Sequence, residues 1–67
     1  MKIEEKDGTF TANLGRILVG YICESRTLKV IHTEDGKVLR ADVYDHDMTL
    51  PEFKDVVEKY NKLIYLL

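Results

Sequence analysis

The chain has 67 residues, of which 45% are hydrophobic and 33% are charged, with a net charge of −2. A chain of this size hides only about 60% of its unfolded surface on folding, so we expect one small domain, residues 1–67, that is marginally stable alone and for which self-association or a partner is expected. The net negative charge excludes a general attraction to nucleic acid or to anionic lipid.

The sequence also bears on the compartment. No apolar run approaches the roughly 20 residues that a membrane span requires. The opening residues, MKIEE, lack the charged-then-apolar layout of a signal peptide. Cys23 is the single cysteine and cannot form an internal disulfide, which fits a reducing compartment. We therefore expect a cytoplasmic protein.

The first two thirds of the chain read as antiparallel strands. Runs rich in alternating apolar, β-branched and aromatic residues occupy residues 9–14, 16–23, 28–33 and 38–44. Residues 2–6 offer only Ile3 as an apolar side chain, so a further strand there, joined through an Asp7-Gly8 turn, stays open. We predict a three- to four-stranded antiparallel meander.

The turn at Asp35-Gly36 predicts the register of the last hairpin. Asp-Gly between two β-rich runs favours a two-residue type I′ turn, because both central positions need positive φ. With these two residues at the turn, Lys29 faces Asp42 as an opposite-charge pair that supports a sheet.

Turns at the two earlier connections place Ala12 opposite Ile17 and Tyr21 opposite Val30. The predicted core face then carries His32, partly buried, at its turn end. Its other members are Phe10, Ala12, Ile17, Val19, Tyr21, Cys23, Leu28, Val30, Leu39, Ala41 and Val43.

Residues 48–67 predict an amphipathic helix. Thr49 and Glu52 have the spacing of a capping box, and Met48 and Phe53 that of a hydrophobic staple. The apolar residues then recur at helical spacing along one side: Phe53, Val56, Val57, Tyr60, Leu63, Ile64 and Leu67. The predicted fold class is therefore α+β, a meander with one C-terminal helix packed on one face.

The face of the sheet turned away from the helix, called the outer face below, is less polar than a face in water should be. Scattered apolar residues are common on protein surfaces. Aliphatic and aromatic groups clustered beside arginine are instead typical of interfaces. We expect a protein-binding surface, and homodimerisation through it is the simplest form. The candidate residues are Leu18, Ile22, Ile31, Val38, Arg40 and Tyr44, with Tyr65 and Leu66 of the helix.

No pattern in the sequence predicts catalysis, a metal or a cofactor. In an extended Asp45-His46-Asp47 segment the two carboxylates share a side and the imidazole points away. Cys23 and His32 lie about 13 Å apart along the predicted sheet, too far for a shared zinc ion. Ser25 sits in a predicted turn without a neighbouring base, and no phosphate-binding glycine loop is present.

Two binding functions remain after these exclusions. The first is a non-enzymatic protein-interaction module, a small adaptor or inhibitor that self-associates. The alternative is a small nucleic-acid-binding domain, in which Tyr44 with Lys29, Arg40 and Arg16 would form a weak version of an aromatic and basic sheet face.

Overall fold

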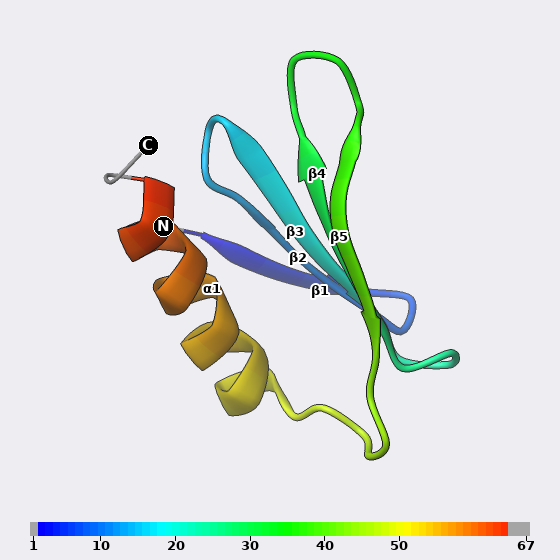
Figure 1. Cartoon of the computed structure of the whole chain (residues 1–67). Helices are drawn as coiled ribbons and strands as arrows, with labels where there is room; N and C mark the ends of the chain where they lie inside the picture. The colour runs from blue at the N-terminus through cyan, green and yellow to red at the C-terminus, as the bar shows by residue number, and fades with distance from the viewer. Residues whose placement is uncertain (1, 65–67) are drawn as a thin grey trace.

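The computed structural model describes residues 2–64 and consists of one antiparallel sheet with a helix on one side of it (Figure 1). The sheet has five strands in sequence order. These are β1 (Ile3–Lys6), β2 (Thr9–Asn13), β3 (Ile17–Ile22), β4 (Thr27–His32) and β5 (Val38–Val43), followed by α1 (Leu50–Ile64). The α+β class, the meander and the C-terminal helix are confirmed.

The predicted number of strands was too low, because the N-terminal segment and every later β-rich run each form a strand. Ile3 of β1 lies opposite Ala12 of β2. The connection is a tight turn in which Asp7 and Gly8 have φ values of 50° and 75°. Aspartate and glycine tolerate this left-handed region better than most residues, so the two-residue turn closes here.

The core lies between the sheet and α1. Alternate residues of β2, β3 and β4 turn their side chains to the helix, and Phe53 and Val57 of α1 are fully buried against them. The rings of Phe10 and Phe53 lie 5.5 Å apart between centroids. The buried residues are Phe10, Ala12, Ile17, Val19, Tyr21, Leu28, Val30, Met48, Phe53 and Val57.

The helix begins where the capping box predicts. The backbone N–H of Glu52 donates to Oγ1 of Thr49 at 3.3 Å, and the N–H of Thr49 donates to Oε1 of Glu52 at 3.3 Å. Met48 and Phe53 are both buried, as the hydrophobic staple requires. The hydroxyl of Tyr21 accepts a hydrogen bond from the N–H of Met48 at 3.2 Å, which fixes the helix entry to the middle of the sheet.

The β4–β5 turn is longer than predicted. The N–H of His32 donates to the carbonyl of Lys37 at 2.8 Å, so four residues lie within the closed turn. Gly36 has a φ of 72°, but Asp35 is not among the residues with positive φ, as a type I′ turn would require. Thr33 is instead drawn toward the β2–β3 turn, where its hydroxyl donates to the carbonyl of Gly15 at 2.6 Å.

A β-bulge at Leu39 then changes which side chains of β5 face the helix. Ile31 pairs with Val38, but Val30 pairs with Arg40, so Leu39 is the extra residue. An inserted residue reverses the alternation of all residues that follow it. The predicted register was therefore wrong: Lys29 lies opposite Ala41, and Leu28 lies opposite Asp42. The predicted burial of Leu39, Ala41 and Val43 was also wrong, since all three are exposed, although Leu39 stays on the helix side.

The registers of the earlier strand pairs differ from the prediction by two residues. Ala12 pairs with Val19 rather than Ile17, and Tyr21 pairs with Leu28 rather than Val30. A shift of two residues preserves the alternation of faces, because the side-chain period of a strand is two. The predicted core residues of β2, β3 and β4 are therefore confirmed. His32, at the turn end of this face, is half-buried as expected.

Candidate protein-binding surface

Six aliphatic side chains lie together on the outer face of β3, β4 and β5. The strand pairing places them in two rows across the sheet. One row joins Leu18, Ile31 and Val38, and the other joins Ile22 and Val43 through Thr27. Ala41 lies between the rows on β5. We call Leu18, Ile22, Ile31, Val38, Ala41 and Val43 the outer patch.

The outer patch is accessible to a partner. Leu18 and Ile31, which lie next to each other on β3 and β4, are half-buried. The side chains toward the edge are more open, with exposed fractions of 39% for Ile22, 50% for Val38 and 77% for Val43. A sheet face in contact with water normally carries polar side chains. The outer patch is therefore unusual for a face that meets only solvent.

A shallow hollow marks the middle of the outer face. Gly20 lies opposite Lys29 on β4 and opposite Thr11 on β2. A Cβ added to Gly20 would have the carbonyl oxygen of Phe10 as its nearest neighbour, at 3.9 Å, so the space above the glycine is open. The hollow has a volume of about 230 Å³, and Leu18, Ile22 and Ile31 are among its lining residues. Lys29 is the one cation of this hollow's lining.

The structure brings together four of the predicted binding residues, namely Leu18, Ile22, Ile31 and Val38. The predicted outer-face position of Arg40 was wrong, because the bulge at Leu39 turns it to the helix side, opposite Val30. Tyr44 also lies on the helix side, with its ring 6.1 Å from that of Tyr21 at an angle of 85°. Tyr65 and Leu66 lie outside the described residues.

Ala41 and Val43 belong to the outer patch although the sequence analysis placed them in the core. Their exposure depends on the bulge, and no glycine or proline marks that position of β5. The alternation of Arg40 and Asp42 with Ala41 and Val43 fits either face of a hairpin. The alternation therefore predicts which residues of β5 share a face, but it does not predict which of the two faces packs against the helix.

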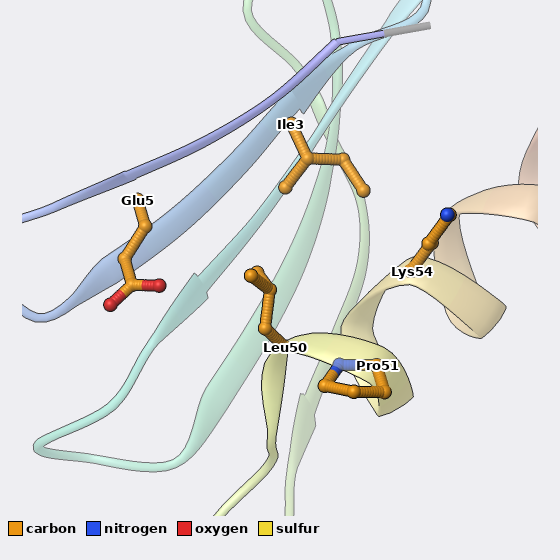
Figure 2. Close-up of a pocket in the computed structure, with 5 residues that line it drawn as sticks. All are labelled: Ile3, Glu5, Leu50, Pro51 and Lys54. Atoms are coloured by element: carbon orange, nitrogen blue, oxygen red, sulfur yellow. The ribbon is translucent and has the colours of Figure 1, made fainter.

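On the helix side, hollows beside α1, among them one near its start and one near its end, show that the helix covers the sheet incompletely. The first, of about 490 Å³, lies between β1 and the start of α1, where Ile3 and Leu50 approach each other (Figure 2). Glu5 and Lys54 lie at its borders. The second, of about 340 Å³, lies between β5 and the end of α1, with Leu39, Arg40 and Tyr60 in its lining.

The polar groups beside the second hollow pair with one another. The guanidinium of Arg40 donates to Asp42 at 2.6 Å. This hydrogen bond, with the charge of Asp42, raises the pKa of Arg40 above its ordinary value. Burial is the main cause that raises the pKa of the Tyr44 hydroxyl. Lys29 lies on the opposite face, so the aromatic and basic residues of the nucleic-acid alternative do not share one surface.

The Asp45-His46-Asp47 segment forms two separate contacts rather than one site. His46 lies between Asp45, at 2.9 Å from Nδ1, and Glu52, at 2.8 Å from Nε2. Asp47 instead accepts from the Nε of Arg26 at 2.9 Å. Within residues 2–64, no three His, Cys, Asp or Glu side chains are arranged to hold a metal ion. Through these contacts the connection between β5 and α1 is held to Arg26, before β4, and to Glu52 in the first turn of α1.

Comparison with known proteins gives no family for this chain. No family model, no curated protein and no solved structure matches it. None of the helices in the described part of the chain is long and apolar enough to cross a membrane.

Proposed function

We propose that this protein is a non-enzymatic protein-interaction module, a small adaptor or inhibitor, that binds a partner protein through the outer patch. The observation that supports the proposal is the gathering of six aliphatic side chains from three neighbouring strands on the face opposite the helix. Contiguous exposed apolar groups of this kind mark interaction sites in soluble proteins. The single cysteine, Cys23, supports a cytoplasmic location for the module.

The charge within the outer patch favours a partner of particular chemistry. Lys29 lies between Gly20 and Ala41, in the middle row of the same face. A second copy stacked symmetrically over the centre of the patch would place Lys29 against Lys29, which is unfavourable. We therefore infer that the partner presents an aliphatic surface with a carboxylate at its centre. This carboxylate would meet the lysine, while the aliphatic groups meet Ile31 and Leu18.

Substitution at the centre of the patch tests the proposal. Ile31 pairs with Leu18 and with Val38, so Ile31→Glu places a charge in the middle of this aliphatic row of the patch. Ile31 does not face the core, so the folding stability should change by less than about 1 kcal/mol. Binding to the partner should weaken about thirtyfold or more, as expected for a central contact.

Two matched variants make the result interpretable. Lys6→Glu places a glutamate on the outer face but on β1, outside both the outer patch and the lining of the hollow over Gly20, and should leave binding intact. Val30→Glu lies one residue from Ile31 but faces the buried core, and should unfold the protein. Proteins captured by the wild-type chain would be identified, purified and titrated against each variant. A partner that binds Ile31→Glu as tightly as wild type would show that the outer patch is not the binding surface.

A salt series separates this function from nucleic-acid binding. Contacts between aliphatic groups depend weakly on ionic strength. Binding to phosphates instead weakens steeply as the salt concentration rises, because the counterions that binding releases then contribute less to the affinity. We expect the affinity for the partner to change little between low and moderate salt. A steep loss, or capture of nucleic acid by the wild-type chain but not by Lys29→Ala, would overturn the proposal.

A further inference from the structure

β5 is an edge strand whose outer backbone groups have no partner among the described residues. It ends the strand order and pairs only with β4, and it lies open at the border of the sheet in Figure 1. Unpaired edges are templates for the addition of a further strand. The opposite edge, β1, carries Glu4, Glu5 and Lys6, and charged side chains of this kind protect an edge.

The hydrogen bonds of the β4–β5 ladder show which groups of β5 are free. The N–H of Tyr44 donates to the carbonyl of Arg26 at 2.8 Å. Backbone groups alternate in direction along a strand. Asp42 and Arg40, which lie two and four positions before Tyr44, therefore also direct their N–H and C=O groups toward β4. The N–H and C=O of Ala41, between them, point away from β4 to the free edge.

The side chains around Ala41 are complementary to themselves under a twofold rotation. If two copies of β5 pair antiparallel with Ala41 opposite Ala41, the two alanines exchange both N–H···O=C hydrogen bonds. Arg40 of each copy then lies opposite Asp42 of the other. Opposite charges in this position stabilise an antiparallel pair. Both side chains lie on the helix side of the sheet, where they already contact each other within one chain at 2.6 Å.

The charges of Arg40 and Asp42 make the neighbouring registers unfavourable. A shift of the rotation axis to Arg40 would place Arg40 against Arg40, and a shift to Asp42 would place Asp42 against Asp42. Intermediate registers would set outward backbone groups against inward ones, so that hydrogen bonds could not form. Compared with these neighbouring registers, the alignment centred on Ala41 satisfies both the backbone and the charges, and it alone pairs Arg40 with Asp42 of the other copy.

We propose that a second copy of this chain joins through the free edge of β5, in antiparallel register centred on Ala41, to form a continuous ten-stranded sheet. Closed twofold pairing is the commonest symmetry of homodimers. It covers both β5 edges at once. The outer patches of the two copies then become neighbours across Ala41 and Val43, on one continuous sheet face. This interface is formed by the backbone edge of β5, whereas the outer patch presents side chains on the sheet face, so the edge pairing does not depend on the partner of the outer patch.

Charge reversal tests the register directly. Arg40→Asp leaves carboxylates at positions 40 and 42 of both copies, and Asp42→Arg leaves guanidinium groups at both positions. Each variant alone should dimerise about tenfold more weakly than wild type, because like charges lie opposite each other twice in the interface. An equimolar mixture of the two variants restores opposite charges at every position. It should therefore dimerise nearly as well as wild type, and sedimentation of purified protein would measure all three.

A second variant tests the backbone pairing without a change of charge. Ala41→Pro removes the N–H that points to the free edge and leaves the hydrogen bonds to β4 in place, a position where sheets tolerate proline. It should abolish the dimer while the cooperative unfolding transition remains. Together with the charge variants it keeps the test valid even if one substitution prevents folding.

The results that would overturn the edge dimer are distinct from those that would overturn the proposed function. A wild-type chain that sediments as a monomer up to millimolar concentration contradicts it, as does a mixture of charge variants no more dimeric than either alone. A dimer lost in Ile31→Glu but kept in Ala41→Pro would place self-association on the outer patch instead. The binding of another protein to the outer patch is measured separately, through Ile31, and does not depend on these outcomes.

Discussion

The Nε2 of His46 lies 2.8 Å from Oε2 of Glu52, the same carboxylate whose Oε1 accepts the backbone N–H of Thr49 at the start of α1. The connection before the helix is thus joined to the helix cap through one side chain. Asp45 completes the arrangement on the other side of the ring, 2.9 Å from Nδ1. Only the protonated imidazole can donate to both carboxylates at once.

This arrangement predicts a pH-dependent contribution to stability. The hydrogen bonds to Asp45 and Glu52 raise the pKa of His46 above its ordinary value of 6.5. The contribution of His46 is therefore complete below pH 6.5 and is lost as the pH rises through the raised pKa. The hydrogen bond to His46 lowers the pKa values of Asp45 and Glu52 below their ordinary 3.8 and 4.5, so their contribution is lost as the pH falls through those lowered values.

The combined contribution of these three groups is greatest between the ordinary pKa values of Glu52 and His46. Urea unfolding measured at a series of pH values should show wild type losing stability relative to His46→Asn at acid pH and again above neutrality. His46→Asn cannot change its charge in this range, so it serves as the reference. A difference between the two proteins that stays constant from about pH 5 to 8 would contradict the predicted role of His46.

Loss of the helix cap should destabilise the protein. Thr49→Ala removes the hydroxyl that accepts the N–H of Glu52 at 3.3 Å. The expected cost is about 1 kcal/mol in the free energy of unfolding, as for other N-cap substitutions. Thr49→Ser retains the acceptor and should restore most of the stability. If Thr49→Ala leaves the urea midpoint unchanged, the hydroxyl does not stabilise the start of α1.

The start of the helix could be predicted because its signals are local. The capping box and the staple each depend on residues within a few positions of one another, and Thr49, Glu52, Met48 and Phe53 occupy their expected places. The core faces of β2, β3 and β4 were also predictable, since their alternation survives a register shift of two residues.

The outer patch could be predicted only in part, because it depends on a non-local feature. Thr33 is held by the β2–β3 turn through the carbonyl of Gly15. This contact joins residues 18 positions apart. It accompanies the longer turn, and the bulge at Leu39 then decides the faces of Arg40 and Ala41. Such a contact leaves no periodic signal in the sequence, so four of the six residues of β5, from Arg40 to Val43, were assigned to the wrong face.

The hydroxyl of Tyr21 should matter more than that of Tyr44. Tyr21→Phe leaves the buried N–H of Met48 without its acceptor, now at 3.2 Å. An unsatisfied buried donor costs about 1–3 kcal/mol. Tyr44→Phe removes a hydroxyl from the neighbouring half-buried ring and keeps the contact between the two rings, so it is the matched control. Equal urea midpoints for the two variants would show that the bond to Met48 contributes no stability.

Substitution of Gly20 by alanine should have opposite effects on folding stability and on binding. Its φ is not in the left-handed region, and an added Cβ would lie no closer than 3.9 Å to any atom outside its chain neighbours. Because glycine in a strand costs roughly 0.5–1 kcal/mol relative to alanine, Gly20→Ala should raise the free energy of unfolding by up to that amount. Gly36→Ala is the control, since its φ of 72° makes alanine unfavourable and should lower stability.

The same substitution at Gly20 partly fills the hollow between Thr11 and Lys29 on the outer face. If a side chain of the partner enters this hollow, Gly20→Ala should weaken binding while the protein becomes more stable, and Gly20→Val should weaken it further. Calorimetric titration would measure the affinity and thermal unfolding would measure the stability of each variant. A variant with a damaged fold would lose both affinity and stability. Unchanged affinity in Gly20→Val would confine the contact surface to the aliphatic rows on either side of the hollow.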